Sequence, residues 1–429
     1  MAKAFDFYTL PNGVRVVLVP MIGVESVAVG VYIKTGSRYE TPEINGLSHF
    51  MEHMAFKGTK RLPTTKDTSR LEGLGAIQNA WTDVGATAYW CKIPVDYWQQ
   101  GLEVVKELAL YPRFPAKDLE IERGVVLEEI RRREDRPDEI SQELLVSTMF
   151  SHNPLGMTTL GDSKVIKKVT RQDFVNYHKQ QYVSQRLVVV LAGNISKSRS
   201  KIESTVAKWF GSMPKSEGKN FAPVELKQTK PVVKITQKDL ANQAHVCLGI
   251  HGFAVADPRR FASTLMTAYL GQGLSSRLFL ELREKRGLCY AVRADEDRLE
   301  DTGIWSVYTG TGMETLEKAM EGVLVEMGRM KEVKLTPKEL AQAKEKVRGP
   351  LLFSKENPIN QMEFYARQVL DRPQEVLDYD IIINRLMQVT VNDIRNVALE
   401  LFTTTKLNLA VVGPIKSDQK DNLLKLLKV

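Results

Sequence analysis

The sequence predicts an α+β fold made of two similar domains, and three observations support this prediction. Each half of the 429-residue chain opens with strand-like apolar runs and passes on to helical patterns. A segment near the end of the first half recurs near the end of the second. The stretch between the halves is rich in Gly, Pro, Ser and Lys and lacks periodicity, which is typical of a linker. Strands mixed with helices in both halves favour the α+β class.

The length of the chain predicts more than one domain, because more than about 300 residues rarely share a single core. In the first half, strands are predicted for residues 14–20 and 26–35. In the second half, strands are predicted for residues 232–236 and 244–252, before a helical stretch that begins at Asp257. The two halves therefore start in the same way.

An internal repeat predicts that the two halves also end in the same way. Residues 169–195 match residues 389–415 at a constant offset of 220, with seven of 27 positions identical. Each copy has a Thr at a helix N-cap position with Asp three residues later, and an apolar strand-like run follows the helix. We therefore expect domains at residues 1–210 and 232–429, joined by a linker at residues 211–231.

Composition narrows the class of protein. The net charge of +8 is spread along the chain rather than gathered into blocks, so nucleic-acid binding is not expected. Cys91, Cys247 and Cys289 are too few and too widely spaced for a disulfide framework or a cysteine zinc site. The chain shows neither a secretory signal pattern nor an apolar run of about 20 residues. We expect a cytoplasmic protein that does not enter a membrane.

The strongest chemical signal is the motif H-x-x-E-H at residues 49–53. Residues four apart lie on one face of a helix, so His49 and His53 can direct their imidazoles at one metal ion. Glu52 lies beside His53, close enough to act on a water molecule without being a ligand. This is the inverted form of the H-E-x-x-H zinc-protease motif. The alternative is a pair of histidines on an ordinary amphipathic helix.

A catalytic zinc site commonly takes three protein ligands, so a third must come from elsewhere in the chain. The best source is the charged helical segment at residues 118–136, where Glu122 and Glu129 lie two turns apart on one face with Val125 and Val126 between them. We expect these carboxylates to face inward. The pattern separates Glu129 only weakly from its neighbour Glu128.

With these residues in place, the chain resembles the inverzincin metallopeptidases, the family of pitrilysin, insulysin and the mitochondrial processing peptidase, and in particular its bacterial single-unit members. The resemblance covers nearly the whole chain. It implies that the third zinc ligand is the Glu that lies 76 residues after the second motif histidine, which is Glu129, and that Glu122, seven residues earlier, orients the site. It also implies that Asn79 and Ala80 lie on an edge strand that pairs with the substrate backbone.

The second half lacks H-x-x-E-H, so it cannot hold a second copy of this metal site. Family members carry an Arg and a Tyr seven residues apart in this half, and the chain has Arg283 and Tyr290 at that spacing. The resemblance implies that both donate hydrogen bonds to the substrate and that Tyr290 stabilises charge on the carbonyl oxygen. Without the resemblance, Arg283 is a surface helix residue and Tyr290 a core aromatic.

The expected function is that of a zinc endopeptidase with one Zn²⁺ per chain, acting on peptides or unfolded segments. Longer members of the family carry four such domains, so this chain is expected to form half of a two-lobed chamber and to dimerise, as a homodimer or with a related subunit. Two other classes remain open from the sequence alone. One is a non-catalytic structural or partner subunit of a processing-peptidase-like complex, and the other is a basic nucleic-acid-binding module, for which only the net charge of +8 speaks.

Overall fold

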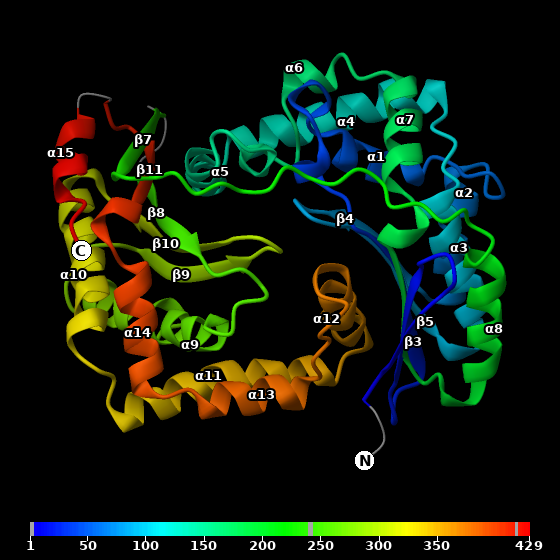
Figure 1. Ribbon diagram of the computed structural model, residues 1–429. Helices are drawn as coiled ribbons and strands as arrows, with labels where there is room; N and C mark the ends of the chain where they lie inside the picture. The colour runs from blue at the N-terminus through cyan, green and yellow to red at the C-terminus, as the bar shows by residue number, and fades with distance from the viewer. Residues whose placement is uncertain (1–3, 239–242, 417–418) are drawn as a thin grey trace. The chain divides into compact units, whose positions relative to one another are not determined.

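The computed structural model of the chain describes residues 4–238, 243–416 and 419–429. The chain forms two compact units, each built around its own mixed sheet (Figure 1). The first unit comprises Met1–Ile130, Met157–Ala222 and Phe353–Asp378, and the second comprises Arg131–Gly156, Pro223–Leu352 and Tyr379–Val429. The predicted α+β fold with two similar domains is confirmed.

The first unit contains a six-stranded sheet in the order β1-β2-β6-β3-β5-β4. Its strands are β1 (Asp6–Thr9), β2 (Arg15–Pro20), β3 (Ser26–Ile33), β4 (Ile77–Thr82), β5 (Thr87–Pro94) and β6 (Leu187–Gly193). Neighbouring strands are antiparallel except β2 and β6, which are parallel. The strand β4 lies at one edge of the sheet and pairs only with β5.

Helices cover both faces of this sheet, which explains why its central strands are apolar on both sides. Val16 and Leu18 of β2 belong to the large core, whereas Val17 and Val19 of the same strand pack with α12 on the opposite face. The helices of the first unit are α1 (Leu47–Ala55), α2 (Thr65–Thr68), α3 (Trp98–Leu110), α4 (Ala116–Glu134, to Ile130), α6 (Ser163–Ile166), α7 (Arg171–Gln181), α8 (Arg199–Phe210) and α12 (Pro358–Asp371).

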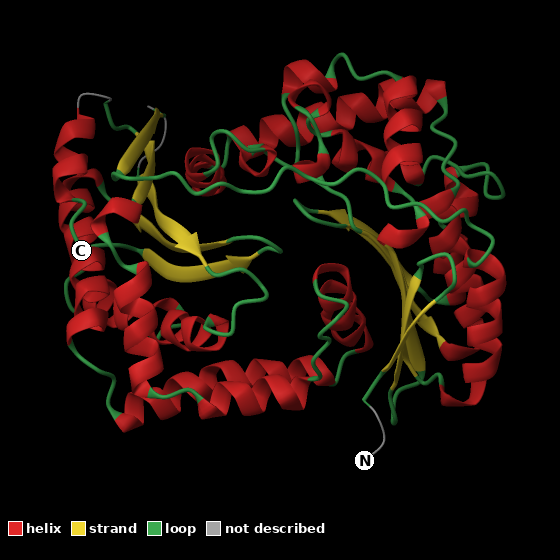
Figure 2. Cartoon of the chain, viewed as in Figure 1, coloured by secondary structure: helices red, strands yellow, loops and turns green. Residues whose placement is uncertain are grey.

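The second unit repeats this plan around a five-stranded sheet in the order β7-β11-β8-β10-β9. Its strands are β7 (Val232–Gln237), β8 (Ala244–Gly252), β9 (Ala291–Arg298), β10 (Gly303–Thr311) and β11 (Asn408–Gly413). Its helices are α5 (Pro137–Met149), α9 (Arg260–Gly271), α10 (Leu316–Glu332), α11 (Pro337–Lys355, to Leu352), α13 (Tyr379–Gln388), α14 (Val391–Leu401) and α15 (Lys420–Leu426), together with a π-helix at Phe279–Glu284. Figure 2 shows helices, in red, on both faces of each yellow sheet.

The internal repeat seen in the sequence has the same structure in both copies. Thr170 and Thr390 each cap a helix, because the side-chain oxygen accepts a hydrogen bond from the backbone N–H three residues later. The carboxylates of Asp173 and Asp393 in turn accept a hydrogen bond from the backbone N–H of the threonine. These are capping boxes. The helices α7 and α14 that they open lead to β6 and β11, which hold the same central place in the two sheets.

The units differ from the predicted domains in one respect, because the chain exchanges a helix between its halves. The helix α5 lies in the sequence of the first half but packs on β11, β8 and β7 of the second unit. Conversely, α12 lies in the second half but packs on β6, β3 and β2 of the first unit. The prediction of contiguous domains at residues 1–210 and 232–429 is therefore wrong for these two segments. The remaining boundary, between Ala222 and Pro223, does fall within the predicted linker.

A glycine in each central strand makes room for the exchanged helix. A Cβ atom at Gly30 of β3 would lie 2.8 Å from the sulfur of Met362 on α12. A Cβ atom at Gly249 of β8 would lie 2.6 Å from a methyl group of Leu145 on α5. Glycine inside a strand commonly marks such a close approach. Sequence periodicity within one half could not reveal the exchange, because the partner of each apolar face lies in the other half of the chain.

Candidate metal centre

The H-x-x-E-H motif lies on α1, a short helix whose ends the sequence marks with glycine. Gly46, with φ of +94°, is the N-cap residue, and Gly58 follows the last turn with φ of +133°. Leu47, Phe50, Met51, Met54 and Ala55 fix one face of α1 in the core. Burial of that face leaves His49 and His53 together on the other, as their spacing predicted.

The helix α4 supplies a carboxylate to the same place. Glu122, Val126 and Ile130 of α4 are buried, and Glu129 is half-buried. The expected inward direction of Glu122 is therefore found. Val125 is 42% exposed and is not part of the buried face. It lies three residues after Glu122, a turn of about 300°, which leaves it on the flank of the stripe that contains Glu122 and Val126.

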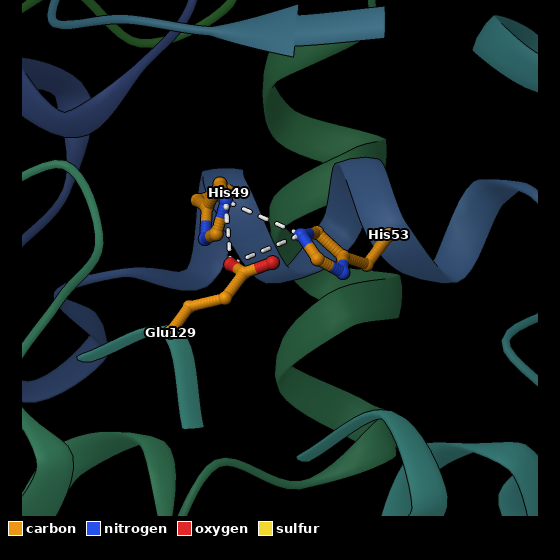
Figure 3. Close-up of side chains that lie close together, drawn as sticks. All are labelled: His49, His53 and Glu129. Carbon is orange, nitrogen blue, oxygen red and sulfur yellow. Dashed lines mark hydrogen bonds and ion pairs between the residues drawn. The ribbon is translucent and has the colours of Figure 1, made fainter. Parts of the chain in front are cut away.

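The side chains of His49, His53 and Glu129 converge on one point, as Figure 3 shows. The two Nε2 atoms lie 3.3 Å apart, and each lies 3.6 Å from Oε2 of Glu129. Donor atoms around a tetrahedral ion with bonds of about 2.0–2.1 Å lie about 3.3 Å from one another. Two imidazole nitrogens and one carboxylate oxygen are also a donor set that suits Zn²⁺. The arrangement therefore fits a zinc ion. Glu128 is exposed and belongs to no such group among the described residues.

Glu122 contacts the imidazole of His53 at the ring nitrogen that does not face the donor triangle. Nδ1 of His53 lies 3.0 Å from Oε1 of Glu122 and donates its hydrogen to that carboxylate, which leaves the lone pair of Nε2 directed at Glu129. Lys57, one turn after His53, lies 2.7 Å from the other oxygen of Glu122. Burial alone would raise the pKa of Glu122, but the bonds from His53 and Lys57 outweigh it and hold that pKa below its ordinary value. The carboxylate therefore stays ionised.

The two histidines have opposite electrostatic surroundings in the metal-free chain. Burial, and then the neighbouring His53, lowers the pKa of His49 to about 3, so its imidazole is neutral. Burial works in the same direction at His53, but Glu122, Glu129 and Glu52 outweigh it and raise the pKa of His53. Protonation therefore competes with metal binding more strongly at His53 than at His49.

Glu52 lies on the side of α1 that faces β4 and makes a hydrogen bond with it. Oε2 of Glu52 accepts a hydrogen bond of 2.7 Å from the hydroxyl of Thr82, the last residue of β4. Burial raises the pKa of Glu52, while the bond from Thr82 lowers it; the net effect is a raised pKa. Such a carboxylate is a stronger base than one in water, which suits general acid–base chemistry.

The strand β4 presents an unpaired backbone edge next to this carboxylate. Asn79 and Ala80 lie in the middle of β4, opposite Trp90 and Tyr89 of β5. Because β4 is the last strand of its sheet, every second backbone group on its outer side is open to another strand. The N–H of Ala80 lies 2.9 Å from the amide oxygen of Asn79. The predicted edge position of Asn79 and Ala80 is found.

Arg283 and Tyr290 lie in the second unit, on either side of a turn. Arg283 is exposed on the π-helix, with its guanidinium 4.8 Å from the ring centre of Phe279. Tyr290 immediately precedes β9 and is 40% exposed, so its interpretation as a core aromatic is wrong. Its backbone N–H donates to the carbonyl of Gly310, and a Cβ atom at Gly310 would lie 2.4 Å from the Tyr290 hydroxyl. The absence of a side chain at Gly310 therefore lets the phenol lie along β10.

Three side chains at these sites were not found from the sequence. They are Lys57, Thr82 and Glu40, which lies at the start of α1 and is described below. Lys57 lies four residues after His53, in the turn that follows α1, so its contact with Glu122 depends on how α4 packs there. Thr82 and Glu40 carry no local signal, since their partners lie 30 and six or more residues away across a strand or a loop.

Other reactive side chains have structural surroundings. The three cysteines are buried and free, and burial raises the pKa of the Cys289 thiol to about 11. His178 donates from Nε2 to the carbonyl of Ala109, and His245 lies 2.8 Å from the hydroxyl of Tyr308. Within the described residues, no helix is both long enough and apolar enough to cross a membrane.

Comparison with known families places this geometry in context. Residues 15–163 match the model described as insulinase, peptidase family M16, and residues 168–347 match the model described as the peptidase M16 inactive domain. The first match contains the motif, Glu52 and Glu129. The second contains Arg283 and Tyr290, in the part of the chain without H-x-x-E-H.

Relatives and solved structures are similar to this protein along nearly the whole of its chain. The zinc protease YmxG of Bacillus subtilis, itself uncharacterized, is 36% identical over 95% of this chain and 98% of its own. An uncharacterized zinc protease of Streptomyces coelicolor is 31% identical over 97% of this chain and 91% of its own. The fold matches the crystal structure of a protease from Helicobacter pylori with a TM-score of 0.88, at 24% identity over 96% of this chain and 99% of that one. The chain belongs to peptidase family M16.

Proposed function

We propose that this protein is a zinc-dependent endopeptidase with one Zn²⁺ per chain. The single observation that carries the proposal is the triangle of donor atoms from His49, His53 and Glu129, with the carboxylate of Glu52 beside it on the same helix. The relatives named as zinc proteases support the same metal and reaction.

In this proposal, His49, His53 and Glu129 hold the zinc ion, and Glu122 orients His53 through its Nδ1–H. When bound, zinc acts as a Lewis acid that makes water a stronger acid and polarises a peptide carbonyl. The raised pKa of His53 makes protonation compete with metal binding at this residue, so the site should bind metal better as the pH rises.

Glu52 is the proposed general base. Its carboxylate accepts a proton from the water that attacks the scissile carbonyl, and later transfers that proton to the leaving amine. The water oxygen thereby ends in the new carboxylate product, and the proton ends on the new amine. Burial raises the pKa of Glu52 and so makes the carboxylate a better proton acceptor, and the bond from Thr82 fixes the carboxylate in one direction.

Two further elements would hold the substrate. The open edge of β4 at Asn79 and Ala80 can pair with an extended peptide through backbone hydrogen bonds, which demand little of the peptide sequence. The guanidinium of Arg283 and the hydroxyl of Tyr290 donate hydrogen bonds, which suits a substrate carbonyl and its developing negative charge. Such a site favours peptides or unfolded segments over folded proteins.

We further propose a homodimer, in which each chain supplies half of a closed chamber, with a related subunit as the alternative partner. A cytoplasmic location belongs to the same proposal. The alternative function is a non-catalytic partner subunit. The second matching family model is described as an inactive domain, which is the reason to consider this alternative. An intact donor triangle favours the catalytic role.

Zinc content and peptide cleavage, measured on one preparation, test the proposal. We expect about one zinc per chain, and cleavage of an unstructured peptide pool that a chelator stops and added Zn²⁺ restores. Replacing Glu52 by Gln should lower kcat by about 10² to 10⁴ while zinc stays bound, because only the base is removed. Glu128→Gln, on the exposed face of α4, is the matched control and should cleave at the wild-type rate. Zinc-loaded wild type that cleaves no peptide would favour the non-catalytic alternative.

A further inference from the structure

A carboxylate outside the motif lies against the beginning of the helix that carries it. Glu40 is 2% exposed, and its side chain lies at the N-terminus of α1. Oε2 accepts hydrogen bonds from the backbone N–H of Gly46, at 2.7 Å, and from the side-chain amide of Asn45, at 3.0 Å. Oε1 accepts a hydrogen bond from the backbone N–H of Ser48, at 2.6 Å. The first turn of α1 is therefore capped by a residue from outside the helix.

The helix has no cap of its own. Its N-cap residue is Gly46, which has no side chain to accept a hydrogen bond. Ser, Thr, Asp or Asn at that position would provide one. A Cβ atom at Gly46 would lie 2.6 Å from the Cα of Gly161, so the packing of the loop at Gly161 excludes those residues. Glu40 supplies from a distance the acceptor that the N-cap position cannot hold.

This carboxylate is costly to bury, which calls for an explanation. The groups that contact it are the backbone N–H of Gly46 and of Ser48 and the side chains of Asn45 and Ser48, all of them neutral, and no lysine or arginine of the described chain pairs with it. Burial raises the pKa of Glu40 to about 7, against the effect of the hydrogen bonds. Buried carboxylates are usually paired with a cation. The hydrogen bonds and the positive end of the α1 dipole offset the charge here.

The two histidines of the motif differ in how they are held, and this difference indicates what Glu40 does. His53 is oriented by Glu122 through Nδ1. Nδ1 of His49 is buried and has no hydrogen-bond partner among the described residues. Metal-binding histidines are usually oriented by a hydrogen bond at the second nitrogen. His49 lacks that support, so its direction depends on the backbone from which it projects.

That backbone is fixed at the residue before His49. The N–H of Ser48 is bound by Glu40, and the hydroxyl of Ser48 donates to the hydroxyl of Tyr177, at 2.9 Å. Tyr177 is held in turn by Thr35, at 2.9 Å. Two hydrogen bonds to buried groups, one at the backbone N–H and one at the hydroxyl of Ser48, therefore fix the residue that precedes His49.

We propose that Glu40 is a positioning residue for the metal centre, which fixes the first turn of α1 and thereby directs the imidazole of His49 toward His53 and Glu129. The inference rests on the proposed role of His49 as a ligand. Glu40 thus does for His49 through the backbone what Glu122 does for His53 through a hydrogen bond.

The test is the zinc dissociation constant of full-length Glu40→Gln, measured by competition with a chelator, with the visible spectrum of the Co²⁺-substituted protein beside it. We expect zinc binding to weaken by about 10- to 100-fold, the range found for groups that orient metal ligands. The Co²⁺ spectrum should shift, because the geometry around His49 changes. Glu40→Asp, which keeps the charge but is one methylene shorter, should fold and show a smaller loss of the same kind.

Glu107→Gln is the matched control in the same unit. Glu107 is 1% exposed, accepts hydrogen bonds from the hydroxyl of Thr59 and the backbone N–H of Arg61, and lies 3.7 Å from Nζ of Lys106; none of these partners belongs to α1. This variant should bind zinc as the wild type does. Wild-type affinity and spectrum in both Glu40 variants would overturn the proposal, as would an equal loss in Glu107→Gln. Wild type that binds zinc but cleaves no peptide would contradict the proposed enzyme and leave this inference intact.

Discussion

The two units share one architecture, but among the described residues only the first contains the donor triangle. The helices α4 and α11 are both 19 residues long, and each is followed by a helix that starts with proline, at Pro137 and Pro358. At this offset of 221, the residue that corresponds to Glu122 is Ala343, and the residue that corresponds to Glu129 is Pro350.

This difference separates the requirements of the fold from those of the site. The second unit keeps the strand order, the capping box and the exchanged helix without any of the donors. Ala343 is buried where Glu122 is buried, so the position needs a residue that fits, and the carboxylate is needed only for His53. A proline inside α11 costs a backbone hydrogen bond that the first unit retains at Glu129. The donors of the first unit are therefore dispensable for the architecture.

The largest expected effect is at Glu129. Replacing Glu129 by Ala removes one of three proposed ligands, so we expect zinc affinity to fall by more than about a hundredfold, beyond the range for groups that only orient ligands. The fold should survive, because the second unit folds with proline at the corresponding position. Metal content after gel filtration, with a circular dichroism spectrum, measures both. Glu128→Ala is the control, and equal zinc loss in both variants would contradict the assignment of Glu129.

The next effect concerns the contribution of the second unit. Tyr290→Phe removes one hydrogen-bond donor from the proposed oxyanion site, and we expect kcat to fall by about a hundredfold with zinc content unchanged. Steady-state kinetics on one peptide give kcat and KM separately. An unchanged kcat would leave Tyr290 without a role in the reaction.

The same variant also tests whether the partner chain completes the site. Suppose that Tyr290 acts across a homodimer, and that the Tyr290→Phe and Glu52→Gln chains are mixed, dissociated and reassociated. Half of the dimers are then mixed, and each mixed dimer holds one intact site out of two. We therefore expect up to about a quarter of the wild-type activity. Mixtures that remain as inactive as their components would place Tyr290 in its own chain's site.

The last expected effect does not touch the site: it is a pH dependence of stability that the two units should share. Burial lowers the pKa of His178 in the first unit to about 4, and burial followed by Lys406 does the same for His251 in the second. In the unfolded chain both bind a proton below about 6.5. Between these values the unfolded state holds more protons, so stability is complete above about pH 6.5 and is lost as the pH falls toward 4.

Each histidine should contribute up to about 3 kcal/mol to this loss, and less for His251, which is less deeply buried. Urea unfolding at pH 7 and pH 5 measures it, with His178→Gln and His251→Gln as the variants. Each substitution should flatten the pH dependence of the free energy of unfolding. A wild-type slope in both variants would mean that other groups cause the acid sensitivity.

Much of the local structure could be predicted because its causes are local. The strand predicted for residues 244–252 is found with the same bounds, and the capping boxes at Thr170 and Thr390 are found as predicted. The spacing of His49 and His53 placed both on one face of α1. These features depend on residues within a few positions of one another.

The assignment of the carboxylates needed more than local pattern. Periodicity alone left Glu128 and Glu129 open, and the family resemblance chose Glu129, which is the one that lies beside the two histidines. Of the two valines between the carboxylates, Val126 is buried, whereas Val125 is 42% exposed. Tyrosine rings are often buried, but the ring of Tyr290 is 40% exposed. It lies along β10 at Gly310, where a side chain would collide with it.

By itself the sequence determined the class of fold, the duplication, the strands and helices at the ends of each copy, and the histidine pair with its neighbouring Glu52. Tertiary structure alone decided that α5 and α12 are exchanged, that Thr82 binds Glu52, and that Glu40 caps the helix of His49. The physical reason is distance along the chain. A helix period or a cap is encoded by neighbours, whereas a buried carboxylate or an apolar face takes its partner from whichever segment folding brings to it.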